Sequence, residues 1–584
     1  MFLLEKVQSG KTGQVFGIIS SSADEGFDIF ILLTTDNVRL QEQTFKRALS
    51  TLDTFCIISE NDELRFAQNN MRKPVLIILK KNYKVLERWR NNLSSSGFLS
   101  SGRPLFIIDD EGDAASLNTK INNQEQSTIN LHIQEIKKMS TSSIYLQVTA
   151  TAQALLLQTS LSGWKPQFVY YFRPGKNYLG GNFFYSDPQS YVIKLIEEDE
   201  LDNLKSDEDY ITQGLSKALL TFLVTSAHIF LSKISNVCNF LIHPSVRISD
   251  HNIAANKIGE FLNQLVIADN ENCLKDELKE IWLELQKTQP DLYDFDKSFD
   301  FINQNLTAQK IKIITMNSDS PSNTEHEIGI NVIIGGNSLG RGVTFNSLQT
   351  IYYSRKAKIP QADTFWQHCR MFGYDRIPAL MRIFISPLLH KLFSNLNKSN
   401  NALIEHIMIN GLDNLNIVTP EGVNPTRKNI LEKDSLIITV GGVNYFPNYP
   451  INKSIKGIDT ILNDFLDDNY SECQLDTITE ILSLMNSEQP EEWNSQGFKA
   501  CVKMLAETHK TEKGIIIIRK DRKISKGTGT LLSESDRKLG DRFKDRLTLT
   551  LYKITGEKKL GWDDIPLWVP NIKFPEGFVF YRTE

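Results

Sequence analysis

The first residues of the chain have types and spacing that suit the binding of a polyphosphate. In a phosphate-binding loop, a tight turn points backbone N–H groups at the phosphates, one lysine neutralises the β and γ oxygens, and one hydroxyl ligates Mg²⁺. Gly10, Lys11 and Thr12 supply these parts, although Glu5 stands where the first glycine of the full pattern is usual. We therefore expect ATP and Mg²⁺ to bind here, with the nucleotide held by Gln8, Ser9, Gly10, Lys11 and Thr12.

A second set of residues is acidic and follows an apolar run. The run at residues 105–108 is followed by Asp109, Asp110, Glu111, Gly112 and Asp113. If this run is a strand beside the loop, Asp110 and Thr12 would hold the Mg²⁺, and Glu111 would orient and deprotonate the attacking water. The alternative is a solvated acidic turn. The two sets together predict nucleotide hydrolysis, with Glu111 and Lys11 as catalytic residues.

Two arginines much further along the chain suit the stabilisation of a transition state. A nucleotide bound between two sheets needs cations from the second sheet near its γ-phosphate. Arg370, on a helix predicted over residues 362–372, is the first candidate for this catalytic role, and Arg376 is the second. The alternative for each is a structural ion pair.

These residues need parallel sheets to position them. Residues 1–162 alternate short apolar runs with polar helical stretches, which is typical of a parallel sheet with helices on both faces. The expected strands are residues 27–33, 56–59, 75–79, 105–108 and 144–148. A second domain of this kind is expected over residues 232–398, with strands at residues 239–242, 311–315, 331–334, 350–353 and 381–385.

The rest of the chain has a different pattern. Residues 163–231 are predicted to be a connector or helical insertion, with helices at residues 190–198 and 213–232. Residues 399–584 are predicted to be an accessory domain, with an acidic helical stretch at residues 458–486 and strands at residues 515–518 and 547–553. The expected fold class is α/β, with two RecA-like parallel-sheet domains that form an ATP cleft, a helical insertion and an α+β C-terminal domain.

Composition limits the class of protein. The 584 residues carry a net charge of -5, so binding to a polyanion would depend on local clusters. The six cysteines are scattered, with no pair at disulfide-framework or zinc-site spacing, which fits a reducing cytosol. No signal peptide is recognised, and no segment approaches about 18 uninterrupted apolar residues. We therefore expect a soluble cytoplasmic protein with no membrane partner.

Several motifs resemble those of superfamily 2 helicases. Residues 110–113 look like the Asp-Glu-Ala-Asp box, and Thr149-Ala150-Thr151 resembles the Ser-Ala-Thr coupling motif. Residues 335–345 and 367–376 are similar to motifs V and VI, and residues 34–44 lie where such motors place a strand-contacting motif. Together these motifs most resemble the bacterial Z1 domain family, over residues 4–396. Cys369 and Asp375 depart from the family, which usually has glycine and arginine there.

The resemblance implies a set of roles for these residues. It adds Gly340, Arg341 and Gly342 to the nucleotide site and makes Thr149, Ala150 and Thr151 coupling residues. It also implies that Thr34, Asn37, Arg39 and Thr344 contact nucleic acid. The family carries an endonuclease label and occurs with helicase-like ATPases in restriction and phage-defence operons. It therefore implies a DNA motor or remodelling protein with partner defence or restriction-modification proteins, and RNA is not excluded.

Some alternatives stay open at this stage. The chain could instead be a nucleotide-gated scaffold that recruits a nuclease or methyltransferase, or it could itself be the endonuclease, although residues after 400 show no convincing nuclease centre. Lys80 and Lys81, after a predicted strand, could touch a phosphate backbone or lie in a solvated loop. The basic stretch at residues 513–553 could contact nucleic acid or form a salt-bridged surface.

Overall fold

The computed structural model describes the chain except for residues 69–71, 188, 207–210, 267–270, 317–327, 337–338, 340–343, 414, 466–469, 491, 528–530 and 584. Two compact units make up the chain. Unit 1 comprises Met1–Leu155, Tyr170–Asn397 and Thr426–Ile430. Unit 2 comprises Leu156–Val169, Lys398–Pro425 and Leu431–Glu584.

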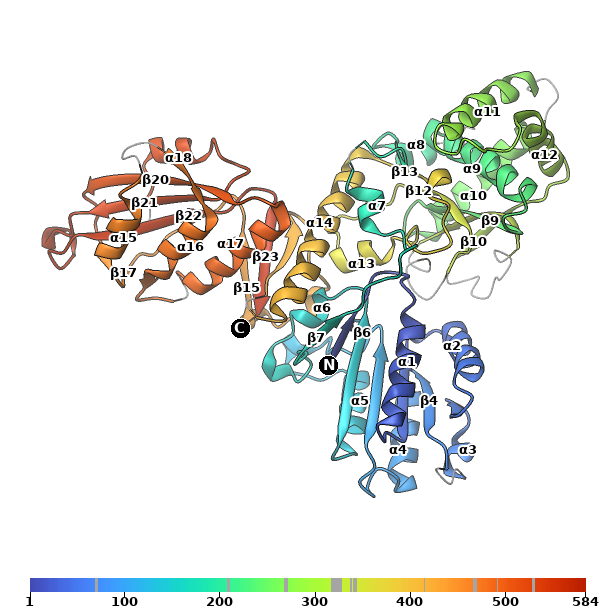
Figure 1. Cartoon of the computed structure of the whole chain (residues 1–584), viewed down its shortest axis with the longest axis horizontal. Helices are drawn as coiled ribbons and strands as arrows, with labels where there is room; N and C mark the ends of the chain where they lie inside the picture. The colour runs from blue at the N-terminus through green and yellow to red at the C-terminus, as the bar shows by residue number, and fades with distance from the viewer. Residues whose placement is uncertain are drawn as a thin grey trace. The chain divides into compact units, whose positions relative to one another are not determined.

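The first sheet of unit 1 has the strand order β3-β4-β2-β5-β6-β1-β7 (Figure 1, blue to cyan). Its strands are β1 (Phe2–Leu4), β2 (Ile29–Thr34), β3 (Cys56–Ser59), β4 (Val75–Lys80), β5 (Leu105–Asp110), β6 (Ser143–Thr149) and β7 (Val169–Tyr171). The pairs from β3 through to β1 are parallel. Continuous burial along β2, β4 and β5 explains why these strands are apolar throughout rather than alternating.

Helices join these strands as expected for a parallel sheet. They are α1 (Lys11–Asp24), α2 (Val38–Thr51), α3 (Glu63–Ala67), α4 (Tyr83–Ser96), α5 (Thr128–Lys138) and α6 (Gln153–Leu156). The amphipathic helix α4 buries Val85, Leu86, Trp89 and Leu93. Strands β2 to β6 lie where the sequence predicted them, so the parallel sheet expected here is confirmed.

The second sheet of unit 1 has the order β10-β11-β9-β12-β13-β8, and every pair in it is parallel. Its strands are β8 (Ile193–Leu195), β9 (Val237–His243), β10 (Ile311–Met316), β11 (Gly329–Gly335), β12 (Leu348–Tyr353) and β13 (Arg382–Ile385). The helices are α7 (Gly181–Tyr185), α8 (Glu200–Leu204), α9 (Gln213–Leu231), α10 (Ile248–Gln264), α11 (Glu271–Gln286), α12 (Phe295–Thr307) and α13 (Ala362–Gln367). Two parallel sheets, as predicted, confirm the α/β class.

The helix predicted at residues 190–198 is wrong. This segment contains β8 instead, which extends the second sheet beyond β13. The N–H of Ile383 donates to the Val192 carbonyl at 2.7 Å, and the N–H of Ile196 donates to the Ile385 carbonyl at 3.1 Å. Pairing along the open edge of β13 outweighs the local helical pattern, because tertiary context decides the state of a short apolar segment.

Helix α9 agrees with its prediction and lies in the core of the second sheet domain. By length and composition alone it is apolar enough to cross a membrane, but 78% of its apolar window is buried inside the protein. Leu215, Leu219 and Phe222 are among its fully buried residues. It therefore has the burial of a core helix.

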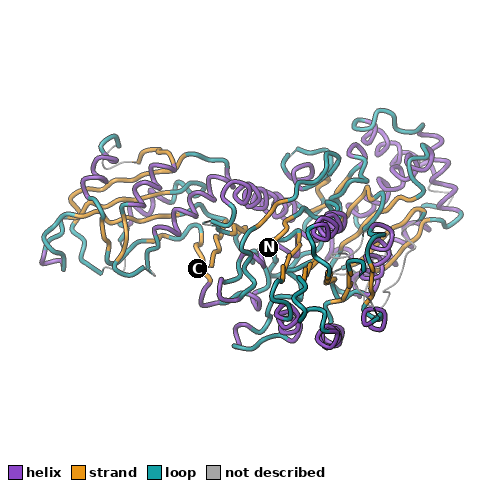
Figure 2. The backbone as a smooth tube through the Cα atoms, turned by 60° about the horizontal axis from the view of Figure 1, so that its bottom comes forward, coloured by secondary structure: helices purple, strands orange, loops and turns teal. Residues whose placement is uncertain are grey.

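Unit 2 has mixed secondary structure, as predicted. A three-stranded antiparallel sheet has the order β14-β23-β15, a five-stranded mixed sheet has the order β16-β22-β21-β20-β18, and β17 pairs with β19. Figure 2 shows these strands in orange on the left of the view. The strands are β14 (Ile417–Pro420), β15 (Leu436–Val440), β16 (Asn444–Tyr445), β17 (Pro450–Asn452), β18 (Tyr470–Gln474), β19 (Met485–Ser487), β20 (Lys513–Arg522), β21 (Thr548–Ile554), β22 (Leu567–Lys573) and β23 (Phe578–Thr583).

The helices towards the C-terminus are α14 (Pro387–Asn410), α15 (Ile455–Leu462), α16 (Leu475–Ser483), α17 (Ser495–His509) and α18 (Glu534–Gly540). The acidic helical stretch predicted over residues 458–486 contains α15 and α16, but it is not continuous, because β18 lies between them. Trp493, Trp568 and Phe574 form part of the buried core of unit 2. The strands predicted at residues 515–518 and 547–553 are confirmed as β20 and β21.

Candidate functional site

The predicted phosphate-binding loop connects β1 to the N-terminus of α1. Gly10 stands at the N-cap with a φ of 98°, a left-handed conformation that favours glycine. Helix α1 has no side-chain hydrogen bond at its cap and no acidic residue in its first turn. A Cβ atom added at Gly10 would meet no atom within 4 Å. The N-terminus of α1 therefore has no side-chain cap, and its positive end suits an anion.

Lys11 meets the acidic residues at the carboxyl end of β5. Its Nζ lies 3.0 Å from Oδ1 of Asp110 and also contacts Oε1 of Glu111. Burial alone would lower the pKa of Lys11, but the two carboxylates raise it above its ordinary value. Burial, together with the charge of Glu111, raises the pKa of Asp110, while Lys11 opposes this shift. The structure thus brings together three of the predicted residues.

The residues around Lys11 fit a hydrated Mg²⁺ bound to a nucleotide. Thr12 lies in the first turn of α1, and the Asp110 carboxylate is held beside Lys11. A hydroxyl and a carboxylate are the hard oxygen donors that Mg²⁺ uses together with phosphate oxygens. Within the described part of the chain, no cluster of three or more histidine, cysteine or acidic side chains forms a separate metal site.

Lys81 is a residue whose role the sequence did not reveal. Its side chain is fully buried, and Nζ donates to Oδ1 of Asp109 at 2.8 Å, to the Asp110 carbonyl at 2.8 Å and to the Glu111 carbonyl at 2.7 Å. Glu111 has a φ of 56°, an uncommon backbone conformation for a residue other than glycine. Lys81 therefore stabilises the turn that presents Glu111, so neither the solvated-loop nor the phosphate-contact alternative describes it.

Glu5, the departure from the usual loop pattern, is almost completely buried. Its N–H donates to the Thr149 carbonyl at 3.2 Å, and the Ser9 hydroxyl donates to its Oε2 at 3.2 Å. Burial raises the pKa of Glu5 from 4.5 to about 7, while Lys11 and the Ser9 hydroxyl act in the opposite direction. A titrating carboxyl therefore lies at the base of the loop.

The predicted coupling residues form a buried network with the last residue of the acidic box. The hydroxyls of Thr149 and Thr151 donate to Oδ1 and Oδ2 of Asp113 at 2.7 and 3.0 Å. Nε2 of Gln367 donates to Oδ2 of Asp113 at 3.1 Å and to the Thr151 hydroxyl at 2.7 Å. Ala150 lies half-buried between the two threonines. Residues of the first sheet domain are thus joined to a residue at the end of α13.

Arg370 lies beside the phosphate-binding loop, but not on a helix. The helix predicted over residues 362–372 is too long, because α13 ends at Gln367. With the Gln8 amide oriented to satisfy both of its ends, its oxygen accepts from Nη1 of Arg370 at 3.2 Å and its nitrogen donates to the Phe372 carbonyl at 2.7 Å. Nε of Arg370 donates to the Leu339 carbonyl at 2.5 Å.

Arg376, the second candidate for stabilising the transition state, is buried and bound to the backbone of the same segment. Its guanidinium donates to the carbonyls of Arg370, Met371 and Phe345 at 3.0, 3.2 and 3.2 Å and contacts Asp375. Burial lowers its pKa, while Asp375 opposes the shift. This arrangement holds the loop that carries Arg370.

Two tyrosines bond to backbone carbonyls of the phosphate-binding loop. The Tyr178 hydroxyl donates to the Val7 carbonyl at 2.5 Å, and the Tyr374 hydroxyl donates to the Ser9 carbonyl at 3.0 Å. Their rings meet edge to face with centroids 5.5 Å apart. The sequence signal for Tyr374 was its place in motif VI, but nothing in the sequence pointed to Tyr178.

Of the other predicted site residues that the structure describes, Thr34, Asn37 and Thr344 are not part of this cluster. Gly340, Arg341 and Gly342 lie outside the described residues, as does the side chain of Arg39. Thr34 is buried, with its hydroxyl 3.4 Å from the Leu79 carbonyl. Asn37 caps α2 by accepting from the Leu40 N–H at 3.1 Å, and Thr344 is exposed. Their contact with nucleic acid remains a prediction.

The predicted basic stretch at residues 513–553 is largely paired with acidic residues. Arg519 and Arg522 bind Asp536, Lys513 and Arg546 bind Glu472, and Lys523 binds Glu557. These contacts match the salt-bridged alternative for this surface. Because the positive charges are paired, they attract a nucleic-acid backbone less strongly.

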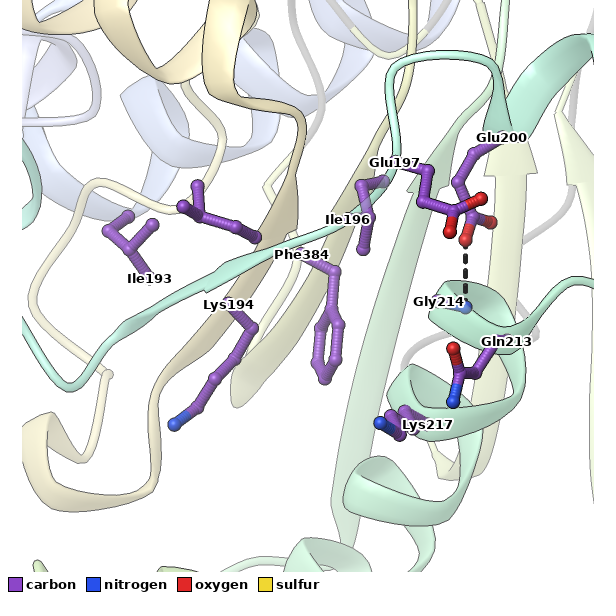
Figure 3. Close-up of a pocket in the computed structure, with 10 residues that line it drawn as sticks. Ile193, Lys194, Ile196, Glu197, Glu200, Gln213, Gly214, Lys217 and Phe384 are labelled. Atoms are coloured by element: carbon purple, nitrogen blue, oxygen red, sulfur yellow. Dashed lines mark hydrogen bonds between the residues drawn. The ribbon is translucent and has the colours of Figure 1, made fainter.

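A cavity of about 510 Å³ lies between β8 and the first turn of α9 (Figure 3). Glu200 accepts from the Gly214 N–H at 2.8 Å with one carboxylate oxygen and from the Tyr352 hydroxyl at 2.8 Å with the other. Lys194, also in the lining, pairs with Glu284 at 2.7 Å. Glu200 and Lys194 thus both have hydrogen-bond or ion-pair partners within the fold, so this cavity has a structural explanation.

Two known families match separate parts of the chain. Residues 214–424 match the Z1 domain, which confirms the predicted resemblance over that range. Residues 439–576 match the C-terminal domain of the restriction endonuclease CglI H-subunit. No curated protein matches the chain.

The chain is also similar to several solved structures. The C-terminal domain of the CglI restriction endonuclease H subunit is 32% identical, and the match covers 24% of this chain and 99% of that chain, with a TM-score of 0.22. Dbp5 of S. cerevisiae bound to RNA and ADP BeF3 is 11% identical over 66% of this chain and 78% of that chain, with a TM-score of 0.32. The DUF1998 helicase MrfA bound to DNA is 11% identical over 74% of this chain and 51% of that chain, with a TM-score of 0.39.

Proposed function

We propose that the chain is an ATP-hydrolysing, helicase-like component of a bacterial restriction or phage-defence system. Two matches support this: the chain carries a Z1 domain, and residues 439–576 belong to the family of the C-terminal domain of the CglI H-subunit. In this proposal it acts on DNA in the cytoplasm and works with partner restriction proteins. Closure of the two sheet domains on ATP would grip or move a strand.

The observation that carries the proposal is the convergence of residues on one loop. Lys11 contacts Asp110 and Glu111 at the carboxyl edge of the first sheet, and Arg370 reaches the same loop through Gln8. A cation, two carboxylates and an arginine are the groups that phosphoryl transfer to water requires. They come from segments far apart in the sequence.

Each group has a definite task in hydrolysis. Lys11 and the N-terminus of α1 would bind the phosphates, while Thr12 and Asp110 would hold Mg²⁺, which supplies charge neutralisation. Phosphate oxygens would compete with Glu111 for Lys11, and this would free Glu111 to accept a proton from the attacking water. Arg370 would exchange its bond with Gln8 for one with the γ-phosphate. Asp113 and Gln367 would transmit this rearrangement of bonds between the two sheet domains.

The test is the ATPase rate of the full chain with and without single-stranded DNA, double-stranded DNA and single-stranded RNA. We expect DNA to raise the rate, and Lys11→Ala and Glu111→Gln to lower it by about 100-fold or more. The exposed α2 residue Lys46 offers a matched control, since Lys46→Ala leaves the site intact. A rate that is equally low with and without every nucleic acid would exclude a motor.

A nucleotide-gated scaffold is the second candidate function. It is favoured by one observation: residues 439–576 belong to a domain family whose named relative is part of a restriction endonuclease. A scaffold would form an ATP-dependent complex with a partner nuclease or methyltransferase, and the complex would survive Glu111→Gln. Translocation and strand-displacement assays would then be blank. Plasmid incubated with the chain, Mg²⁺ and ATP tests endonuclease activity of the chain itself, and nicked product would support it.

A further inference from the structure

A second cavity of unit 1 lies beside the coupling network, the buried bonds that join Asp113, Thr149, Thr151 and Gln367. It differs from the cavity at β8 in how its charged side chains are paired. Its volume is about 450 Å³, and its lining includes Arg355, Gln361, Asp363, Gln367, His368 and Arg427. Four of these residues come from the loop after β12 or from α13. Neither arginine of this cavity has a task in the proposed hydrolysis.

Arg355 is a buried cation whose side-chain partners are histidine nitrogens. The residue is 8% exposed, and its Nη1 donates to Nδ1 of His368 at 2.8 Å and lies 3.4 Å from Nε2 of His243. Its guanidinium also lies 5.7 Å from the centre of the Phe365 ring. Burial lowers the pKa of Arg355, and burial holds the pKa of His243 well below its ordinary value, so His243 is neutral. Among the described residues, no carboxylate forms an ion pair with Arg355.

Arg427 adds a second cation to the cavity without a counter-ion. It is half-buried, and its Nη2 donates to the backbone carbonyl of Asp113 at 2.9 Å. No described carboxylate forms an ion pair with it. Asp363, the acidic residue of the lining, binds donors other than the two arginines. It accepts from the Thr364 N–H at 2.6 Å and from the Thr426 hydroxyl at 2.6 Å. Neither arginine therefore has an ion-pair partner among the described residues of the cavity.

A buried charge that lacks a counter-ion is costly, and folds retain one where a ligand supplies the opposite charge. Lys194 in the cavity at β8 shows the contrast, because it is paired with the carboxylate of Glu284 inside the fold. Guanidinium groups match the oxygens of phosphate with paired donors. Gln361 and the Thr364 side chain add polar groups to the same lining.

We propose that Arg355 and Arg427 form a phosphate-binding site, separate from the phosphate-binding loop, that takes a phosphate group of a nucleic-acid backbone or of a free nucleotide. The site adjoins the coupling network, since Gln367 lines it and bonds to Asp113 and Thr151, and Arg427 bonds to the Asp113 backbone. A phosphate bound here would therefore act on the residues that join the two sheet domains. The site does not depend on ATP hydrolysis by the chain.

The first experiment measures melting temperature against inorganic phosphate at constant ionic strength, in the full chain carrying Lys11→Ala. This background removes the lysine of the loop. We expect the melting temperature to rise with phosphate, because a ligand that binds the folded state stabilises it. Adding Arg355→Met should abolish the rise. In phosphate-free buffer, Arg355→Met should melt no lower than its parent, because it removes an unbalanced buried charge.

The second experiment separates the two sources of phosphate by fluorescence anisotropy. Arg355→Met and Arg427→Gln should each weaken binding of labelled oligo-dT about tenfold if the backbone is the ligand, with a smaller salt dependence. If a free nucleotide is the ligand, the variants should instead weaken a labelled ADP analogue. Arg65→Gln, at an exposed arginine of α3, is the matched control and should change neither.

Two results would overturn the proposal. One is a phosphate-dependent rise in melting temperature that is the same with and without Arg355→Met. The other is a phosphate-free melting temperature that falls on Arg355→Met, which would make Arg355 a compensated structural residue.

Discussion

Gln8 in the phosphate-binding loop bonds to Arg370 when its amide is oriented to satisfy both of its ends, with the amide oxygen 3.2 Å from Nη1 of the arginine. The same glutamine has a φ of 57°, an uncommon conformation for any residue but glycine or asparagine. A polar side chain at a strained position of the loop thus holds the arginine that we propose to act on the γ-phosphate.

Replacing Gln8 by glycine is expected to lower the KM for ATP. The guanidinium would no longer have to leave the amide before it binds phosphate, and glycine accepts the positive φ without strain. Because a hydrogen bond to a charged group contributes about 1.5–3 kcal/mol, the change in KM should be about tenfold. Steady-state ATPase kinetics provide the measurement, with Gln43→Ala on the exposed face of α2 as control. An unchanged or higher KM would show that the contact does not compete with nucleotide.

Replacing Lys81 by methionine is expected to lower kcat while the nucleotide still binds. The substitution removes three hydrogen bonds that stabilise the turn at Glu111 and leaves the buried Asp109 without its cation. Loss of one partner of a buried pair costs about 3–5 kcal/mol of stability.

Chemical denaturation and ATPase assays together test this prediction. The double variant Lys81→Met/Asp109→Asn should recover part of the stability, since it removes the unpaired carboxylate, but not the kcat. If kcat recovers together with stability, Lys81 does not position Glu111. Lys80→Met removes a neighbouring lysine whose ion pair with Glu60 lies outside the site, and serves as the control.

Glu5→Gln is expected to stabilise the protein most at alkaline pH. The folded-state pKa of Glu5, about 7, lies above its ordinary value of 4.5, so the folded state binds this proton more tightly. The free energy of unfolding therefore falls as pH rises from about 4.5 to about 7, where this burial cost becomes complete. Glutamine carries no such cost. In thermal melts, the variant should raise the melting temperature relative to the unmodified protein more at pH 8 than at pH 5. Equal increases at the two pH values would contradict the raised pKa of Glu5.

Breaking the network around Asp113 is expected to uncouple hydrolysis from nucleic acid. Thr151→Val and Gln367→Ala each remove a hydrogen bond to Asp113 but leave Lys11, Glu111 and Arg370 in place. We expect the ATPase rate without DNA to persist and the stimulation by DNA to be lost. A double-mutant cycle between Thr151 and Gln367 should give an interaction free energy of about 0.5–3 kcal/mol. Additive effects would show that the two residues act independently.

Most of the first and second sheets could be predicted from the sequence. Strands β2, β4, β5, β9, β11 and β12 are apolar runs, and burial on both faces of a parallel sheet produces that pattern directly. Short edge strands were missed, because β7 and β8 have three residues each and their state depends on the strand that they join. Helix α13 was predicted too long, since the tertiary bonds of Arg370 and Arg376 replace the helical ones.

The sequence by itself determined which chemical groups lie at the ends of the strands: Lys11 after β1, Asp110 and Glu111 after β5, and Thr149 and Thr151 after β6. The tertiary structure alone decided how these groups are held. Burial removes Lys81 from solvent and turns it into the support of Glu111, and it makes Gln8 the partner of Arg370. The reason is physical: hydrogen bonds and charge balance inside a fold depend on which distant segments exclude water together, and no local pattern records that.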